Sequence, residues 1–365
     1  MNFAALFKKA FEVGASDIHL RAGRSAALRV GGAMVAVAHA DVTEDELLAQ
    51  ITRMVPEHLK GDVYDEAAKG LDFSYTEPGA GRFRCSAFRT LGRLGMTMRT
   101  IKSTIPSLAD LHLPNTVMDI ALSQRGMTLV TGTTGSGKST TLAAMIDLIN
   151  TNYDVKIITV EDPIEYLHDD KKAMITQIEV GSDSTSFDQA LRQALRQDPD
   201  VILIGELRDV ETLRMALRAA DTGHQVFATV HAARAAQTIE RIIAMFPPAE
   251  HKVLLSQLAH SLEAVISQRL VVTREEDGQR RGRRPAIEIL RGGPVTEKCI
   301  TENKLNQLTE FIEGGQSGMQ TFDQHLLEMF SQKIISGTEA LKHANRPDAL
   351  ATAMRGIKYV GHAKG

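Results

Sequence analysis

A glycine-rich segment with a single lysine carries residue types that can bind a nucleoside triphosphate. Residues 131–141 read TGTTGSGKSTT and match the spacing G-x-x-x-x-G-K-S at Gly132, Gly137, Lys138 and Ser139. In such a loop the backbone N–H groups surround the β-phosphate, the lysine reaches the β- and γ-oxygens, and the serine hydroxyl can ligate Mg²⁺. We therefore predict that ATP and Mg²⁺ bind here, with nucleotide contacts from Gly132, Thr133, Thr134, Gly135, Ser136, Gly137, Lys138, Ser139 and Thr140.

Carboxylates that follow two apolar segments could prepare this triphosphate for hydrolysis. The segment KIITV runs into Glu161 and Glu165, and the segment VILI is followed by Gly205 and Glu206. Hydrolysis needs acids that hold Mg²⁺, directly or through its waters, and that orient the attacking water. In the usual pattern the metal-side acid follows its strand at once, whereas here Gly205 displaces it by one residue. We predict that Glu206 serves the metal and its waters, and that Glu161 or Glu165 polarises the nucleophilic water.

Two histidines flank a third apolar segment, QVFATV. His224 precedes this segment and His231 follows it. An imidazole at the carboxyl end of a strand can donate to a γ-phosphate and release when that group leaves. Both histidines are therefore catalytic candidates, with a purely structural role as the alternative.

A basic segment near the end of the first hundred residues could supply cations to a phosphate. Between Gly81 and Lys102 lie five arginines, one lysine and no acid. An arginine supplied by a neighbouring subunit can stabilise charge on the γ-phosphoryl group. We select Arg84 and Arg99 as candidates, with Arg82 as a substitute, and a solvated basic strand is the alternative interpretation.

The segments that must position these residues alternate between strand-like and helical patterns from Met127 onward. Short apolar runs, MTLVT, KIITV, VILIG and QVFATV, are separated by amphipathic stretches with helical spacing. One of these stretches follows the glycine-rich loop and another ends before Gly223. This alternation predicts an α/β fold with a parallel sheet that is covered on both faces.

The rest of the chain divides into smaller parts. Residues 1–103 predict an α+β domain with a hairpin at Gly31-Gly32 and a helix opened by the capping box Thr43-x-x-Glu46. Residues 104–112 form a predicted linker, 113–290 the nucleotide domain and 291–365 a helical C-terminal part with a capping box at Thr321-x-x-Gln324. A cluster of arginines at positions 280, 281, 283 and 284 predicts a charged hairpin tip.

Composition narrows the function classes. The 365 residues include 42 Lys+Arg and 45 Asp+Glu, so the net charge of −3 gives no cationic field that would draw the chain onto nucleic acid. The two cysteines, Cys85 and Cys299, show no metal-ligand spacing and suit a reducing compartment. No run approaches about 18 apolar residues, so we expect neither an export signal nor a membrane span.

Four ordered segments together resemble the secretion ATPase superfamily, whose members drive type II secretion, type IV pili and type IV secretion. GTTGSGKST, TVEDPIEY, ILIGELRD and TGHQVFATVHAARAAQTIERI are similar to its Walker A, Asp box, atypical Walker B and His box. SDIHL, GRFR, GRRPAIEIL and GMQTFDQHL extend the resemblance over nearly the whole chain. Within the superfamily the chain most resembles the pilus retraction ATPases of PilT and PilU type. It departs from the PilT pattern at VTEKCITEN, residues 295–303, which leaves a PilU-like accessory role open.

This resemblance implies a RecA-like P-loop domain behind a PAS-like N-terminal domain, and a homo-hexameric ring in which arginines act across subunits. It implies ATP hydrolysis that drives pilus retraction and twitching motility. The implied location is cytoplasmic, peripheral to the inner membrane, with a membrane platform protein and a related retraction ATPase as partners. The alternatives are a scaffold ATPase with little turnover, a pilus or secretion assembly motor and a DNA-translocating ATPase of helicase type.

Overall fold

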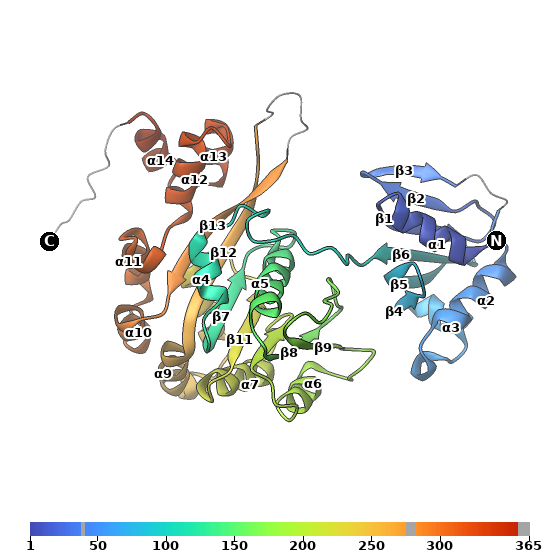
Figure 1. Cartoon of the computed structure of the whole chain (residues 1–365), viewed down its shortest axis with the longest axis horizontal. Coiled ribbons are helices and arrows are strands. Elements are labelled where there is room, and N and C mark those ends of the chain that lie inside the picture. The colour runs from blue at the N-terminus through green and yellow to red at the C-terminus, as the bar shows by residue number, and fades with distance from the viewer. Residues whose placement is uncertain (38–40, 275–281, 357–365) are drawn as a thin grey trace. The chain divides into compact units, whose positions relative to one another are not determined.

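The structure, a computed structural model, describes residues 1–37, 41–274 and 282–356 and forms two compact units (Figure 1). The first unit contains Met1–Thr104, so its main segment ends next to the predicted boundary at residue 103. It also contains Asp162–His168 and Ile178–Ser186, which the sequence interpretation placed in the nucleotide domain. The second unit begins at Ile105 and contains the other described residues.

The first unit is built on a six-stranded antiparallel sheet with the order β3-β2-β1-β6-β5-β4. Its strands are β1 (Ala15–Arg21), β2 (Ala27–Val30), β3 (Ala33–Ala36), β4 (Leu71–Glu77), β5 (Gly81–Thr90) and β6 (Arg93–Thr100). The helices α1 (Phe3–Glu12), α2 (Glu44–Met54) and α3 (Val63–Lys69) contribute to one core with these strands, which contains the fully buried Phe7, Ile18, Leu47 and Phe83. The α+β prediction for this region is therefore confirmed.

Local sequence signals account for two features of the first unit. Gly31 and Gly32 have φ values of 57° and 87°, the left-handed region that a tight hairpin between β2 and β3 requires. At the start of α2 the Thr43 side chain accepts from the Glu46 N–H, and the Glu46 carboxylate accepts from the Thr43 N–H. The predicted hairpin and capping box are both confirmed.

The second unit is built on a seven-stranded sheet with the order β13-β12-β7-β11-β10-β8-β9. The strands predicted from apolar runs are β7 (Gly126–Thr131), β8 (Lys156–Glu161), β10 (Val201–Ile204) and β11 (Gln225–Val230), and they pair in parallel. β9 (Met174–Glu179), β12 (Leu262–Val272) and β13 (Arg283–Arg291) were not predicted. β12 is parallel to β7, but β13 is antiparallel to β12, so the expectation of a wholly parallel sheet was wrong at this edge.

Eleven α-helices accompany this sheet in the described part of the second unit. They are α4 (Asn115–Ala121), α5 (Lys138–Asn152), α6 (Phe187–Ala194), α7 (Val210–Asp221), α8 (Ala235–Ala244), α9 (His251–Ser261), α10 (Pro294–Thr301), α11 (Leu308–Glu313), α12 (Phe322–Ser331), α13 (Gly337–His343) and α14 (Pro347–Met354). The apolar side of α5 packs into a core with β7, β8, β11 and β12. The fold therefore supports the strand, loop and helix order that the glycine-rich segment needs.

The helices that follow β13 confirm the predicted helical C-terminal part. α12, α13 and α14 form a group beside the β12–β13 ribbon in Figure 1. Their core includes Phe322, Leu326 and Ile335 together with Val271 of β12 and Ala286 of β13. Thr321 caps α12 through the predicted capping box with Gln324.

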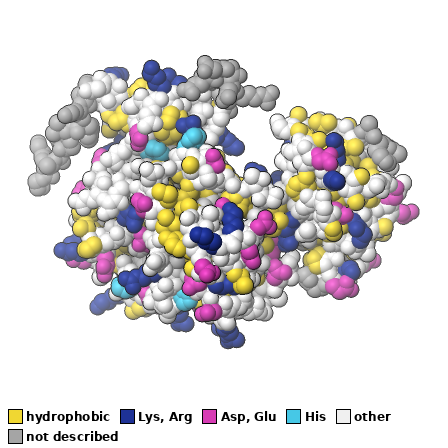
Figure 2. All heavy atoms as spheres, in the orientation of Figure 1, with side chains coloured by type: hydrophobic (Ala, Val, Ile, Leu, Met, Phe, Trp, Pro, Cys, Tyr) yellow, Lys and Arg dark blue, Asp and Glu magenta, His cyan; other side chains and the backbone are white. Residues whose placement is uncertain are grey.

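The charged side chains on the surface are of both signs, as the small net charge suggests. Figure 2 shows Lys and Arg side chains interspersed with Asp and Glu side chains over the viewed face. Cys85 and Cys299 are both buried free thiols.

Among residues 1–37, 41–274 and 282–356, no helix combines the length and apolarity that crossing a bilayer needs. Arg283 and Arg284 begin β13, whereas Arg280 and Arg281, at the predicted hairpin tip, lie outside the described residues.

Candidate active site

The glycine-rich loop joins the end of β7 at Thr131 to the start of α5 at Lys138. Gly132, Gly135 and Gly137 have φ values of 148°, 77° and 92°, which L-residues rarely adopt. A Cβ at Gly132 would lie 2.4 Å from Ser136 Oγ and 2.5 Å from the Gln268 carbonyl oxygen. Within the described chain α5 has no side-chain cap, and a helix N-terminus favours an anion. The loop therefore has the conformation that phosphate binding requires.

Lys138 is folded back onto the loop. Its side chain is 9% exposed, and Nζ donates to the carbonyl oxygens of Gly132 at 3.0 Å and Thr133 at 3.2 Å. These contacts keep the ammonium group at the mouth of the loop. Ser139 and Thr140 are half-buried in the first turn of α5.

The catalytic candidates follow strands that neighbour one another in the sheet. The order β7-β11-β10-β8 is parallel, so His231, Glu206 and Glu161 lie at the same carboxyl edge as the glycine-rich loop. His231 Nε2 lies 3.2 Å from Glu206 Oε1, and Glu206 Oε2 accepts from Arg208 Nε at 2.7 Å. Glu161 Oε1 accepts from Thr159 Oγ1 at 2.7 Å. The structure thus brings three separately predicted residues to one edge and joins two of them directly.

Gly205 explains why the acid of β10 is displaced by one residue. The Gly205 N–H donates to the Val160 carbonyl oxygen at 2.8 Å, which draws the ends of β10 and β8 together. A Cβ at position 205 would lie 3.2 Å from Glu161 Cα and 3.3 Å from the Val160 carbonyl oxygen. Because the end of β8 lies this close, a side chain at position 205 would crowd it, and the carboxylate stands at the next residue, Glu206. The oxygen donors of Ser139 and Glu206 are of the hard type that Mg²⁺ prefers.

The strand order does not place two other predicted residues, Glu165 and His224, at this edge of the sheet. Glu165 is exposed and belongs to the first unit, so the choice between Glu161 and Glu165 as the water-orienting acid stays open. His224 precedes β11. The first residue of β11 pairs with Gly126, and its last residue pairs with Thr131, where the glycine-rich loop begins. The His224 ring Nδ1 lies 2.9 Å from the Ala219 carbonyl oxygen, near the C-terminal end of α7. Within one chain His224 is therefore at the opposite edge from His231, and its catalytic role stays a prediction.

The three candidate arginines lie in the first unit and differ in their partners. Arg84 of β5 and Arg99 of β6 are directly opposite each other, so they share one face of that sheet. Arg82 forms an ion pair with the buried carboxylate of Glu179 at 3.2 Å, inside the same unit. In the described part of the chain the Arg84 side chain is exposed and forms no hydrogen bond or ion pair. Arg84 is therefore the candidate that can contact a phosphate without first breaking an ion pair.

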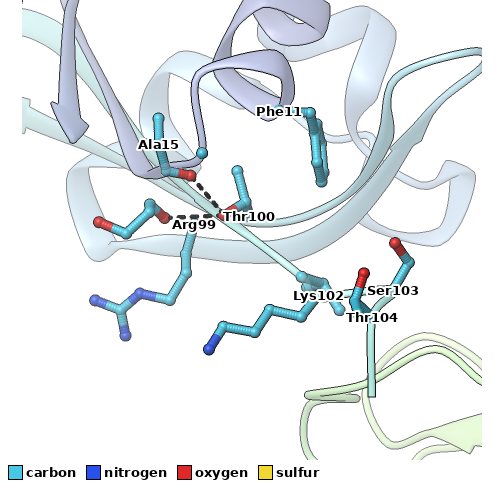
Figure 3. A pocket seen from close by; sticks show the side chains of 10 residues that line it. Phe11, Ala15, Arg99, Thr100, Lys102, Ser103 and Thr104 are labelled. Atoms are coloured by element: carbon cyan, nitrogen blue, oxygen red, sulfur yellow. Dashed lines mark hydrogen bonds between the residues drawn. The ribbon is translucent and has the colours of Figure 1, made fainter. Parts of the chain in front are cut away.

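Arg99 borders a pocket of about 420 Å³ (Figure 3). Its Nε donates to Asp17 Oδ1 at 3.0 Å, while Arg99 and Lys102 extend to the same side of the strand. Burial opposes ionisation of Asp17, but hydrogen bonds from Ser16 and Arg99 outweigh this and lower the pKa of Asp17 below its usual value. Asp17 therefore stays ionised at neutral pH and holds Arg99 in place.

The sequence interpretation missed Gln268, because it did not predict β12. Gln268 is 1% exposed, and its Nε2 donates to the Ser136 carbonyl oxygen at 2.7 Å. The neighbouring Ser267 hydroxyl lies 2.8 Å from Thr131 Oγ1. β12 therefore supports the glycine-rich loop through a side chain 132 positions away in sequence. The apolar run in SLEAVISQRLVV was a signal for this strand, although its polar residues interrupt the pattern.

Comparison with known proteins decides the family. The family model described as "Type II/IV secretion system protein" matches residues 2–342. The chain belongs to this family. It is 40% identical to the "Type IV pilus retractation ATPase PilT" of Pseudomonas aeruginosa, over 95% of this chain and 99% of that protein. It is 38% identical to the "Type IV pilus ATPase PilU" of the same organism, over 96% of this chain and 90% of that protein.

A solved structure of this family agrees with the fold. The crystal structure of the pilus retraction motor PilT with bound ADP covers 95% of this chain and 98% of its own, at a TM-score of 0.85 and 38% identity. The α/β fold predicted from the sequence is therefore confirmed, as is the resemblance to the secretion ATPases.

Proposed function

We propose that this protein is a ring-forming motor ATPase that hydrolyses ATP to drive type IV pilus retraction. The observation that carries the hydrolytic part is the contact of His231 with Glu206, on the strands that follow the phosphate-loop strand in the sheet. The ADP-bound relative and the ATPase names of the PilT and PilU relatives support nucleotide hydrolysis as the activity. The pilus as the load is inferred from those relatives.

The residues at the carboxyl edge of the sheet have different roles in this proposal. The N–H groups of the loop and of the first turn of α5 bind the phosphates, and Lys138 exchanges its loop carbonyls for phosphate oxygens. Ser139 and Glu206 would hold Mg²⁺, which when bound neutralises charge on the phosphates. His231 fixes one Glu206 oxygen and Arg208 the other, so the carboxylate has a defined orientation. Glu161 or Glu165 orients the attacking water.

The arginines extend the site across subunits in this proposal. The first unit carries Arg84, exposed and without an ion pair, opposite Arg99 on one sheet face. In a homo-hexamer this face would meet the triphosphate of the next subunit and make hydrolysis depend on the neighbour. ATP turnover could then move one unit against the other and do mechanical work.

The pilus as the load and the partner proteins are the parts of the proposal that depend most on the relatives. We place the ring at the cytoplasmic face of the inner membrane, against a pilus platform protein and a related retraction ATPase. Nearly equal identity to PilT and PilU, at 40% and 38%, supports a role in retraction without separating a principal from an accessory motor. A role as an assembly motor remains the second candidate.

Deletion of the gene in its host tests the load. Cells without the protein should carry excess surface pili and lose twitching, and the wild-type gene should restore both. A Glu206→Gln gene is the matched control, since it supplies the folded protein without the proposed chemistry and should fail to restore twitching. Cells that lack surface pili after the deletion would instead establish an assembly motor.

A further inference from the structure

Glu288 on β13 is a buried carboxylate that contacts the first residue of α8. It is 1% exposed, and Oε1 accepts from the backbone N–H of Ala235 at 2.9 Å, where α8 begins. Its other oxygen, Oε2, accepts no hydrogen bond within the described chain. A carboxylate at a helix N-terminus is stabilised by the helix dipole.

Two arginines surround the same carboxylate. Arg234 Nε lies 4.0 Å from Glu288 Oε2, and Arg269 adds a favourable charge interaction. Burial raises the pKa of Glu288, and the Ala235 N–H and the two arginines oppose that effect. The negative charge at this point therefore depends on the start of α8 and on the arginines around it.

The helix α8 follows the loop that carries His231. Residues 232–234 separate His231 from Ala235, and the Ala232 N–H donates to the Val230 carbonyl oxygen at 3.1 Å. The loop is thus fixed at one end by β11 and at the other by the bond from Ala235 to Glu288. A short segment held at both ends leaves His231 little freedom relative to Glu206.

Arg269, which adds to the charge cluster, also contacts the C-terminal group of helices. The Arg269 guanidinium lies 4.0 Å from the centre of the Phe322 ring, and Arg269 Nη2 donates to Asn345 Oδ1 at 2.8 Å. Arg269 also donates to the His343 carbonyl oxygen. α12 and the α13–α14 connection are therefore attached to the charge cluster that anchors α8.

We propose that Glu288 is a positioning residue that holds His231 against Glu206 by fixing the start of α8. The inference rests on the proposed role of His231 in ATP hydrolysis. Glu288 does not touch the nucleotide in this proposal, so its loss affects turnover through His231 and leaves nucleotide affinity unchanged.

A double-mutant cycle on the full-length protein tests this. Glu288→Gln keeps the volume and one carbonyl oxygen but removes the charge and the second acceptor oxygen. We expect kcat for ATP to fall on the order of tenfold, with KM and ADP affinity within about twofold of wild type. In a His231→Gln background, followed in single-turnover experiments over hours, the same change should cost less than about twofold.

The control and the contrary outcomes are distinct. Glu263→Gln removes a carboxylate of β12 that pairs with Arg291 at 2.6 Å in the same ribbon, and it should leave kcat unchanged. If Glu288→Gln unfolds the protein, as thermal melting would show, Arg234→Gln replaces it in the cycle, with the same epistasis expected. An equal kcat loss in both backgrounds, or no loss, overturns the inference. Full activity of His231→Gln alone overturns the proposed role of His231 instead.

Discussion

Replacement of Gln268 by methionine tests whether β12 holds the phosphate loop in its binding conformation. Methionine keeps the length and volume of the side chain but cannot donate to the Ser136 carbonyl oxygen, which Gln268 Nε2 contacts at 2.7 Å. Ser136 is 3% exposed, so no water readily replaces the lost donor. A buried acceptor without a partner costs roughly 1–3 kcal/mol.

This cost should appear in nucleotide affinity. Residues 133–135 of the loop are exposed, so the free loop can relax and recover solvation, whereas nucleotide binding requires its native conformation again. If the whole cost is expressed in binding, Kd for ADP rises by roughly 5- to 150-fold, since about 1.4 kcal/mol corresponds to tenfold. Titration of a fluorescent ADP analogue measures this directly.

Gln225 provides a matched control on the neighbouring strand pair. It is 4% exposed, and its Nε2 donates to the Ala121 carbonyl oxygen at 2.9 Å, at the edge of the sheet away from the loop. Gln225→Met loses the same kind of bond and should lower the melting temperature without changing Kd. Wild-type affinity in Gln268→Met, or an equal loss of affinity in Gln225→Met, would refute the reasoning.

Three further predictions concern the rest of the molecule. Glu206→Gln should bind nucleotide normally but release phosphate at least about 100-fold more slowly, and normal release would remove Glu206 from the mechanism. Mixed rings of Arg84→Ala and Glu206→Gln subunits should regain activity that neither variant has; no gain at any ratio, with ring assembly confirmed by size, would contradict action across subunits. Burial lowers the pKa of His325, whose Nδ1 accepts from the Ile287 N–H, so the folded pKa lies below the unfolded value of 6.5. The stability that this group contributes is complete above that value and declines as pH falls from it toward the folded pKa. Urea unfolding at about pH 7.5 and pH 5.5 should therefore show a smaller loss of unfolding free energy in His325→Asn than in wild type. Equal losses in the two proteins would contradict this.

The local parts of the site were predictable from the sequence, because their contacts lie between residues close together in the chain. The phosphate loop is one turn whose glycine positions are set by backbone conformation, so Gly132 to Thr140 identify it without a fold. The hairpin at Gly31-Gly32 and the capping boxes at Thr43 and Thr321 are closed by bonds across three residues or fewer. Apolar runs located the central strands and therefore the residues that follow them.

Only the tertiary structure decided which strand ends meet. The order β7-β11-β10-β8 places His231 beside Glu206, and it assigns His224 to the other edge although both flank the same strand. Gln268 and Glu288 act on segments far away in sequence, and the polar residues of β12 conceal that strand from a pattern of apolar alternation. The pairing of strands and the burial of charged groups are set by packing between distant segments, which spacing along one chain does not encode.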